Sequence, residues 1–204
     1  MCPGRFGDAQ SAGPEHDIPL VASGTMLKIL SISGSLRAVS SNKSLLQAAQ
    51  ILAPEGMQIE PYSDLDRLPH FNPDRENDDI PHVRSLYARV EQADGLLISC
   101  PEYARGIPGS FKNALDWLVG STTFPGKPIA LFSTSPRGVA VQDALQLVLE
   151  TMSAHLVEEA SITLPIPSKE LDAHAIAADP ALSVQLRNAL VAFAMSITDI
   201  SHRD

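Results

Sequence analysis

Two short segments gather the side chains that could do chemistry. The first, residues 34–42, reads Gly-Ser-Leu-Arg-Ala-Val-Ser-Ser-Asn. Ser35, Arg37, Ser40 and Asn42 could all donate hydrogen bonds to one phosphate, and an arginine can do so through two N–H groups at once. Helix N-termini also bind anions, because their first N–H groups are free and the helix dipole is positive there. A phosphate site is therefore one interpretation of this segment.

Ordinary turn chemistry is the other interpretation of the first segment. Gly34 permits a bend, and Ser41 or Asn42 would make a good N-cap. These roles leave Arg37 unexplained in a loop beside an apolar strand. The segment matches neither the dinucleotide fingerprint nor the P-loop pattern. A hydrolase built on Ser35 or Ser40 would need a G-x-S-x-G elbow, which the chain lacks.

The second segment follows the apolar run 95–100 and extends from Pro101 to Gly109. Pro101 would end a strand, and the glycines of the segment would let backbone approach a ligand closely. A flat ring could lie here against backbone atoms, with Tyr103 at its edge. Glu102 is either part of such a site or an ordinary surface carboxylate.

Structural roles are expected for the side chains around the second segment. Cys100 should pack as a small buried hydrophobe. Trp117, on the apolar face of the next helix, should belong to the core. Asn113 and Asp116, on the same helix, should act as structural hydrogen bonders rather than as catalysts.

Strand and helix patterns alternate along the chain and must position both segments. We predict strands at 28–33, 57–62, 95–100, 128–134 and within 156–164, and helices at 42–53, 81–92, from 108, 140–155 and 180–200. Helix three would begin with Pro108 as its first residue. Such alternation requires a doubly wound parallel sheet with helices on both faces. In the order 2-1-3-4-5, strands one and three adjoin where the order reverses, so both segments would face one crevice.

The two segments together resemble the NAD(P)H-dependent FMN reductase family, which includes quinone, chromate and azo-dye reductases. The likeness rests on Gly34-Ser-Leu-Arg-x-x-Ser-x-Asn42, Pro101-Glu-Tyr-x-x-x-x-Pro-Gly109 and Lys112-Asn-Ala-x-Asp-Trp117. It implies a flavodoxin-like fold with a five-stranded sheet and covers the chain from residue 27 to the final helix. Ala104 stands where many members have Asn, and the loop after strand four is shorter than their Gly-Gly-x-Arg run.

The resemblance also implies a cofactor site, a reaction and an assembly. FMN would place its phosphate on the first segment and its ring system on the second. The implied FMN contacts are Ser35, Arg37, Ser40, Asn42, Pro101, Glu102 and Tyr103, with Ser133 and Arg137 added from the loop after strand four. NAD(P)H would reduce the flavin, and a small acceptor would then take its place in a ping-pong sequence. The flavin would carry the chemistry, so no catalytic side chain is expected. A homodimer or homotetramer is implied as well.

A flavodoxin-type electron carrier that serves protein partners is the alternative function. The acidic composition of this chain would suit such a carrier. However, the segment Gly34-Ser-Leu-Arg differs from the Thr- and Gly-rich phosphate loop of such carriers. Residues 1–25 show no periodic pattern and are predicted as a disordered leader. Residues 26–204 are predicted as one flavodoxin-like, FMN-binding reductase domain, with Met26 as a candidate initiator.

Composition and charge exclude other classes of function. The 204-residue chain is 44% hydrophobic and 19% charged, which is the profile of a globular protein. Its net charge of −9 would repel a nucleic-acid backbone, since its 15 Lys and Arg residues form no basic run. Two cysteines cannot form a disulfide framework, no metal site is expected, and no apolar stretch approaches the ~18 residues of a membrane span. We therefore expect a cytoplasmic protein without nucleic-acid or membrane partners.

Overall fold

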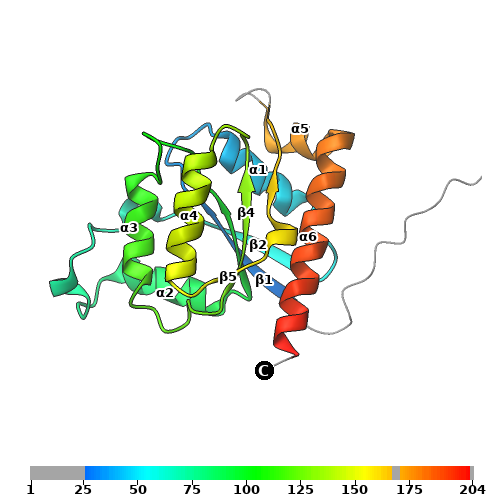
Figure 1. The fold of residues 1–204 in the computed structure, drawn as a ribbon. Coiled ribbons are helices and arrows are strands. Elements are labelled where there is room, and N and C mark those ends of the chain that lie inside the picture. The colour runs from blue at the N-terminus through cyan, green and yellow to red at the C-terminus, as the bar shows by residue number, and fades with distance from the viewer. Residues whose placement is uncertain (1–25, 167–170, 203–204) are drawn as a thin grey trace, which may run out of the picture.

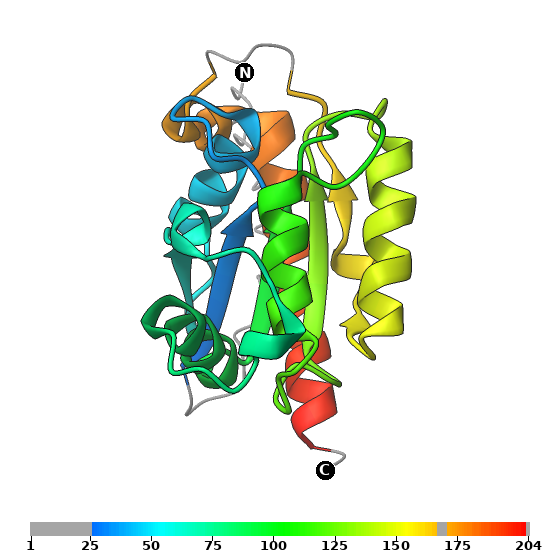
Figure 2. The ribbon, with the colours of Figure 1, turned by 90° about the vertical axis from the view of Figure 1, so that its left-hand side faces the viewer.

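A parallel sheet with helices on both faces forms the centre of the molecule (Figures 1 and 2). The computed structural model describes residues 26–166 and 171–202, so the predicted leader, residues 1–25, lies outside the described residues. The strands are β1 (Leu27–Ser33), β2 (Met57–Tyr62), β3 (Gly95–Ser99), β4 (Pro128–Ser133), β5 (His155–Leu156) and β6 (Ile162–Thr163). The α-helices are α1 (Ser41–Ile51), α2 (Pro81–Gln92), α3 (Gly109–Leu118), α4 (Val139–Thr151), α5 (Ala173–Ala178) and α6 (Pro180–Ser201).

The strand order is β2-β1-β3-β4-β5, and all pairs are parallel. In register, Ile29 of β1 lies opposite Ile59 of β2 on one side and Gly95 of β3 on the other. The order reverses between β1 and β3, so the loops that leave their carboxyl ends diverge there and open a crevice. The predicted flavodoxin-like sheet order is confirmed.

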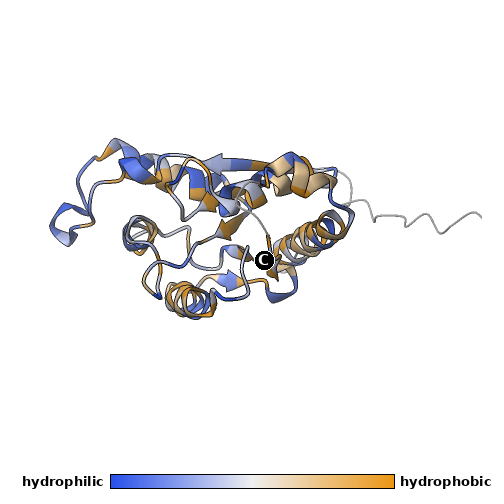
Figure 3. Cartoon of the chain, turned by 90° about the horizontal axis from the view of Figure 1, so that it is seen from above, coloured by the Kyte–Doolittle hydropathy of each residue, from blue (hydrophilic) through white to orange (hydrophobic). Residues whose placement is uncertain are grey.

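Two hydrophobic clusters separate along the two faces of the sheet. Alternate residues of β1 divide between them, because successive side chains of a strand point to opposite faces. Ile29 packs in the cluster under α1 and α6, and Leu30 packs in the cluster under α2, α3 and α4. Every residue of β3 is buried, as expected of a central strand covered on both sides. The helices in Figure 3 carry hydrophobic and hydrophilic residues together, as helices that cover a sheet on one side do.

The structure corrects the prediction for the end of α4 and for strand five. The predicted helix 140–155 ends at Thr151, because Ser153 adopts a left-handed conformation with φ 61° and reverses the chain. The carbonyl of Ser153 accepts a hydrogen bond from Gly126 N–H at 2.7 Å. Strand five is then broken into β5 and β6 by a 3-10 turn, Glu158–Ala160, and β6 pairs with β4.

Two other local predictions are wrong. Pro108 is the N-cap of α3 rather than its first residue, with extended ψ of 136°. The short helix α5 was missed, although Asp172 caps it by accepting a hydrogen bond from Ala175 N–H at 2.8 Å. Six residues are too few for a convincing periodic pattern, so α5 had little sequence signal.

The long loop 63–79 is held against α3 by two polar side chains. Asn113 Oδ1 accepts from Phe71 N–H at 2.7 Å, and its Nδ2 donates to Pro69 O at 2.9 Å. The indole of Trp117 donates to the same carbonyl at 2.9 Å and packs edge-on against Phe71, with ring centroids 5.1 Å apart. Trp117 is buried, so its predicted core role and the predicted structural role of Asn113 are confirmed.

One helix among the described residues, α6, has the length and composition of a membrane span. The expectation that no apolar stretch has this character therefore does not hold for residues 180–201. One side of α6 packs on the sheet through buried residues that include Leu190, Phe193 and Ile197. This packing buries 33% of the apolar window of α6, whereas Val184 and Met195 remain exposed on its other side.

Candidate functional site

Three loops gather at the carboxyl edge of the sheet, which is the upper edge in Figures 1 and 2. They are the first loop (residues 34–40, after β1), the second loop (100–108, after β3) and the third loop (134–138, after β4). A cleft of about 260 Å³, the loop cleft, lies between the second and third loops and borders Asn42 at the start of α1, whereas no residue of the first loop lines it. Its lining includes Asn42, Cys100, Pro101, Glu102, Ser133 and Arg137.

The N-terminus of α1 presents unsatisfied donors beside this cleft. Ser40 is its N-cap and has extended backbone, but its side chain makes no capping hydrogen bond. The carbonyl of Ser40 accepts from Ser44 N–H at 2.9 Å, so the three N–H groups before it, those of residues 41–43, precede the first intrahelical bond. No acidic side chain lies in this turn. Free donors at a positive helix end are the components of an anion site.

Asn42 is fixed so that its amide group remains a donor. Its side chain is 7% exposed, and its Oδ1 accepts from Ser99 Oγ at 2.8 Å. This hydrogen bond joins α1 to the end of β3 and orients Asn42 with its NH₂ as the remaining polar group. Ser99 was not predicted as a site residue, although a hydroxyl at the carboxyl end of an apolar strand is a usable signal for one.

The first and third loops use the same local device, a Ser-x-Ser-x-Arg sequence. In the first loop, Ser35 N–H donates to Ser33 Oγ and Arg37 N–H donates to Ser35 Oγ, both at 3.3 Å. In the third loop, the corresponding bonds of residues 133, 135 and 137 are 3.4 and 3.2 Å long. Serine hydroxyls thus accept hydrogen bonds from backbone N–H groups that no longer have a neighbouring strand as partner. Both loops consequently present an exposed arginine at position five of the repeat.

Glu102 joins the second loop to the third. Its Oε2 accepts from Val141 N–H at 3.4 Å, in the first turn of α4. The N-cap of α4 is Gly138, which has no side chain to serve that turn. A carboxylate is favourable at a helix N-terminus, so Glu102 holds the wall of the loop cleft in place. This contact excludes the interpretation of Glu102 as an unattached surface carboxylate.

A tight reversal projects from the second loop. Tyr103 and Gly106 exchange two backbone hydrogen bonds, of 3.1 and 3.0 Å. The two residues between them, Ala104 and Arg105, have φ of 49° and 60°. Left-handed backbone favours Gly or Asn over other residues, which explains why Asn is common in the family at the position of Ala104. Tyr103 is 48% exposed at the base of this reversal.

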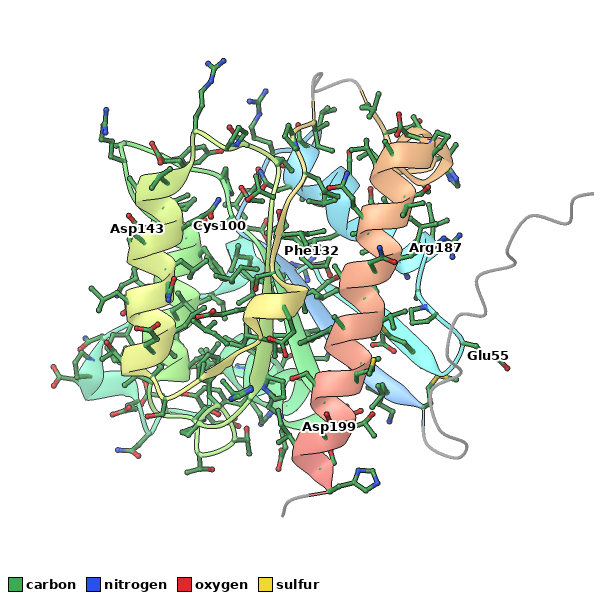
Figure 4. All side chains as sticks on the ribbon, turned by 45° about the vertical axis from the view of Figure 1, so that its right-hand side comes forward. Glu55, Cys100, Phe132, Asp143, Arg187 and Asp199 are labelled. Carbon is green, nitrogen blue, oxygen red and sulfur yellow. The ribbon has the colours of Figure 1, made fainter. Side chains whose placement is uncertain are left out.

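Cys100 lies under the first loop and forms part of the floor of the cleft; Figure 4 shows it beside α4, in the upper half of the sheet. A Cβ added to Gly34 would lie 2.8 Å from Cys100 Sγ and 3.3 Å from its Cα. Glycine is therefore required there by the close approach of the loops after β1 and β3. Burial raises the pKa of the Cys100 thiol from 9.0 to about 12. Cys100 packs against the cluster under α2, α3 and α4, but it is partly rather than fully buried, so the prediction of a small buried hydrophobe is right for its contacts and wrong for its full burial.

The structure brings most, but not all, of the predicted FMN contacts into the loop cleft. Asn42, Pro101, Glu102, Ser133 and Arg137 line it. The other four do not line it: Ser35 and Ser40 are buried in the first loop, where Ser35 lines a separate cleft, and Arg37 and Tyr103 are exposed on the first and second loops. Thr134 and Ser135 also line the cleft and were missed; the Ser-x-Ser-x-Arg repeat was the available signal. Among the described residues, no group of three His, Cys, Asp or Glu side chains could hold a metal ion.

The sheet order defines a flavodoxin-like α/β protein, with the N-terminus of α1 beside a cleft at the carboxyl edge of the sheet. A family model described as NADPH-dependent FMN reductase matches residues 27–166. The chain therefore belongs to the NADPH-dependent FMN reductase family, as the sequence motifs predicted.

Named relatives and solved structures are similar to the chain over different lengths. A 2-hydroxy-1,4-benzoquinone reductase of Burkholderia sp is 41% identical over 112 residues, which are 53% of this chain and 61% of that protein. The match thus spans about three fifths of that relative. An NADPH:quinone oxidoreductase of Arabidopsis thaliana is 31% identical, over 81% of this chain and 89% of its own. A flavoenzyme NAD(P)H:(acceptor) oxidoreductase of Paracoccus denitrificans is 29% identical with a TM-score of 0.69, over 85% of this chain and 98% of its own.

Proposed function

We propose that this protein is an FMN-dependent oxidoreductase that uses NAD(P)H to reduce small acceptors such as quinones. The observation that carries the proposal is the N-terminus of α1, where the Ser40 hydroxyl and the Asn42 NH₂ group are unused, beside a cleft lined by the second and third loops. FMN supplies the chemistry when bound, because its ring system accepts a hydride and passes two electrons on. The residues of the chain supply position and charge.

The residues of the first loop fit a phosphate group. The free N–H groups of residues 41–43 and the amide of Asn42 are donors at a positive helix end. Arg37 adds a cation that can form two parallel hydrogen bonds to one phosphate. Ser35 and Ser40 supply hydroxyls from the buried side of the loop. No carboxylate in the first turn of α1 opposes an anion.

The second and third loops fit a flat ring. Pro101 and Glu102 form one wall and Ser133 and Arg137 the other. Tyr103 would shield the outer edge of the ring from water. Of the acceptors considered, quinones have the support of the named relatives, whereas free flavin, azo compounds and chromate rest on the family resemblance.

A titration of the purified protein with FMN tests this proposal. We expect quenching of flavin fluorescence at one equivalent per chain, and oxidation of NADPH by a benzoquinone only with the FMN-loaded protein. Absence of FMN binding at high micromolar concentration would contradict the proposal. A protein that binds FMN but oxidises NADPH no faster than free FMN would be an electron carrier of the flavodoxin type instead.

Steady-state kinetics test the order of the two half-reactions. Donor and acceptor would use one cleft in turn, so double-reciprocal plots at several quinone concentrations should be parallel. Intersecting lines would require separate sites for donor and acceptor.

A cytoplasmic homodimer or homotetramer is part of the same proposal. Its support is a set of exposed apolar side chains on the first and second loops and at the start of α4, which a second copy could cover: Val39, Tyr103 and Val139. Light scattering should give a mass of two or four chains, and Val39→Asp should lower it. A monomer at micromolar concentration would contradict this assembly.

A further inference from the structure

A second cleft, larger than the loop cleft, lies on the other side of the first loop. Its volume is about 330 Å³, and it runs between α1 and the carboxyl halves of β1 and β2. We name it the serine cleft, because Ser31, Ser33, Ser35 and Ser63 line it. None of the residues that line the loop cleft is shared with it.

The serine cleft exists because small residues replace core residues along one face of β1. Ile29, Ser31 and Ser33 point to the α1 side, since side chains on a strand alternate. Ile29 fills the core there, whereas Ser31 and Ser33 leave space under α1. The hydroxyl of Ser31 donates to Glu60 O at 3.3 Å and that of Ser33 accepts from Ser35 N–H. The polar floor of the cleft is thus hydrogen-bonded and fixed in shape.

The walls of the serine cleft combine apolar surface with a few polar groups of different kinds. Leu46 and Leu65 form apolar sides, while Lys43, Gln47 and Asp66 contribute a cation, an amide and a carboxylate. Neither charged group forms an ion pair among the described residues. A cleft of this size, with apolar sides and polar groups that converge from the floor and walls, has the dimensions of a small-molecule site.

We infer that the serine cleft holds the adenosine diphosphate part of the dinucleotide donor. The inference rests on the proposed function, which requires the nicotinamide ring to reach the loop cleft. In the strand order β2-β1-β3-β4, the serine cleft lies over β1 and β2 and the loop cleft over β3 and β4. The two are therefore about two strand spacings apart, roughly 10 Å, which an extended dinucleotide spans. Lys43 would bind a phosphate, Asp66 the ribose hydroxyls, and Gln47 the edge of the base.

Calorimetric titration of the FMN-loaded protein with ADP tests the site without catalysis. Bound FMN occupies the N-terminus of α1 and the loop cleft, so ADP binding to the loaded protein reports on another site, although Ser35 and Leu36 of the first loop also line the serine cleft. Lys43→Gln removes one charge-assisted hydrogen bond and should raise the Kd for ADP roughly tenfold. Lys28→Gln is the matched control, because this substitution removes the same charge at the opposite, amino-terminal end of β1. Gln47 is an exposed position of α1 that lines the cleft, and Gln47→Trp should prevent ADP binding because the larger side chain would fill the cleft.

A second donor separates this inference from the proposed function. Reduced nicotinamide mononucleotide lacks the adenylate, so its KM should exceed that of NADH, and Lys43→Gln should narrow the gap between the two. No ADP binding, or equal effects of Lys43→Gln and Lys28→Gln, would overturn the serine cleft as the adenylate site. Failure of both donors to reduce the bound flavin would instead overturn the proposed function, whatever the ADP titration gives.

Discussion

At the residue scale, the site consists of donors that the fold leaves without partners. Ser40 occupies an N-cap position without capping, and Asn42 uses its oxygen on Ser99 so that its NH₂ group stays available. Helices α2, α3 and α4 also begin without a side-chain cap. The difference at α1 is that its N-cap is a serine, a residue type that normally caps, and that this hydroxyl and the NH₂ group of Asn42 both stay available for a ligand.

Arg37→Ala should weaken FMN binding by roughly one to two orders of magnitude, since a charge-assisted hydrogen bond contributes about 1.5–3 kcal/mol. Screening at the exposed rim would place the effect at the lower end. Riboflavin lacks the phosphate, so its affinity should scarcely change in fluorescence titrations. Arg187→Ala, on the exposed side of α6 and labelled in Figure 4, is the matched control and should affect neither ligand. Equal weakening of both ligands would assign Arg37 to the ring or to loop stability.

Cys100 should resist alkylation at moderately alkaline pH. Burial raises its pKa to about 12, whereas an ordinary thiol in this chain would titrate near 9.0. At pH 8 the thiolate population is therefore lowered roughly a thousandfold, and the thiolate is the reactive form. Iodoacetamide labelling of the Cys2→Ser variant, followed by mass spectrometry, measures Cys100 alone. Labelling should stay slow from pH 7 to 9 and become fast in urea; rapid labelling of the folded protein would contradict the burial of Sγ.

At the element scale, short structures between strands and helices fix the loops. The reversal from Tyr103 to Gly106 is closed by two hydrogen bonds, and α3 holds the long loop 63–79 through Asn113 and Trp117. Both devices use residues of the motifs that identified the family. Conserving the shape of these loops is thus one physical role of those motifs, apart from ligand binding.

Ala104→Gly should stabilise the reversal by up to about 1 kcal/mol. A left-handed residue with a Cβ costs about 1–2 kcal/mol, and glycine recovers this less its own loss of chain entropy. Thermal denaturation should show a rise of about 2–4 °C. The control Ala88→Gly, in the middle of α2, should lower the melting temperature, because its backbone is helical. A lower melting temperature for Ala104→Gly would argue against the left-handed conformation.

Asn113→Ala should lower the free energy of unfolding by about 1–3 kcal/mol. The change leaves Phe71 N–H without its acceptor and removes one of two donors to Pro69 O. Urea denaturation measures the loss, and proteolysis should detect a newly accessible loop 63–79. Asn188→Ala, at an exposed position of α6, should change stability by less than about 0.5 kcal/mol. Similar losses in the two variants would show that Asn113 does not hold the loop.

At the scale of the whole molecule, positive charge is concentrated at the carboxyl edge of an acidic protein. The net charge is −9, yet Arg37, Arg105 and Arg137 are exposed on the three loops and form no ion pair among the described residues. Such an arrangement attracts anions to one edge while the rest of the surface repels them.

Salt should therefore weaken the use of the anionic donor. We expect the KM for NADPH to rise roughly severalfold when NaCl is raised about tenfold, from about 20 to about 200 mM. The reason is that salt screens the attraction, since the Debye length falls to about 10 Å at 0.1 M. The double variant Arg105→Gln/Arg137→Gln should raise the KM at low salt and reduce this salt dependence. The KM for an uncharged benzoquinone should change little in either experiment. A salt dependence that is equal for NADPH and the quinone would contradict electrostatic attraction by the rim.

The sequence by itself determined the class of fold and the family. Apolar runs such as 95–99 and helical periods such as 81–92 are local signals, and the structure reproduces them. The motifs at residues 34–42 and 101–109 placed the chain in its family. These signals depend on neighbouring residues, which is why one chain without a structure was enough to predict them. The sheet order pairs distant segments, and its prediction depended on the orders common to such folds.

Only the tertiary structure decided how distant segments meet. The Asn42–Ser99 and Glu102–Val141 contacts join residues 57 and 39 positions apart. The left-handed Ser153, the broken fifth strand and the serine cleft likewise follow from packing between elements. A cleft under α1 depends on which face of β1 each serine occupies and on what the helix above leaves unfilled. Such space is a property of the assembled layers, and no single segment of the sequence encodes it.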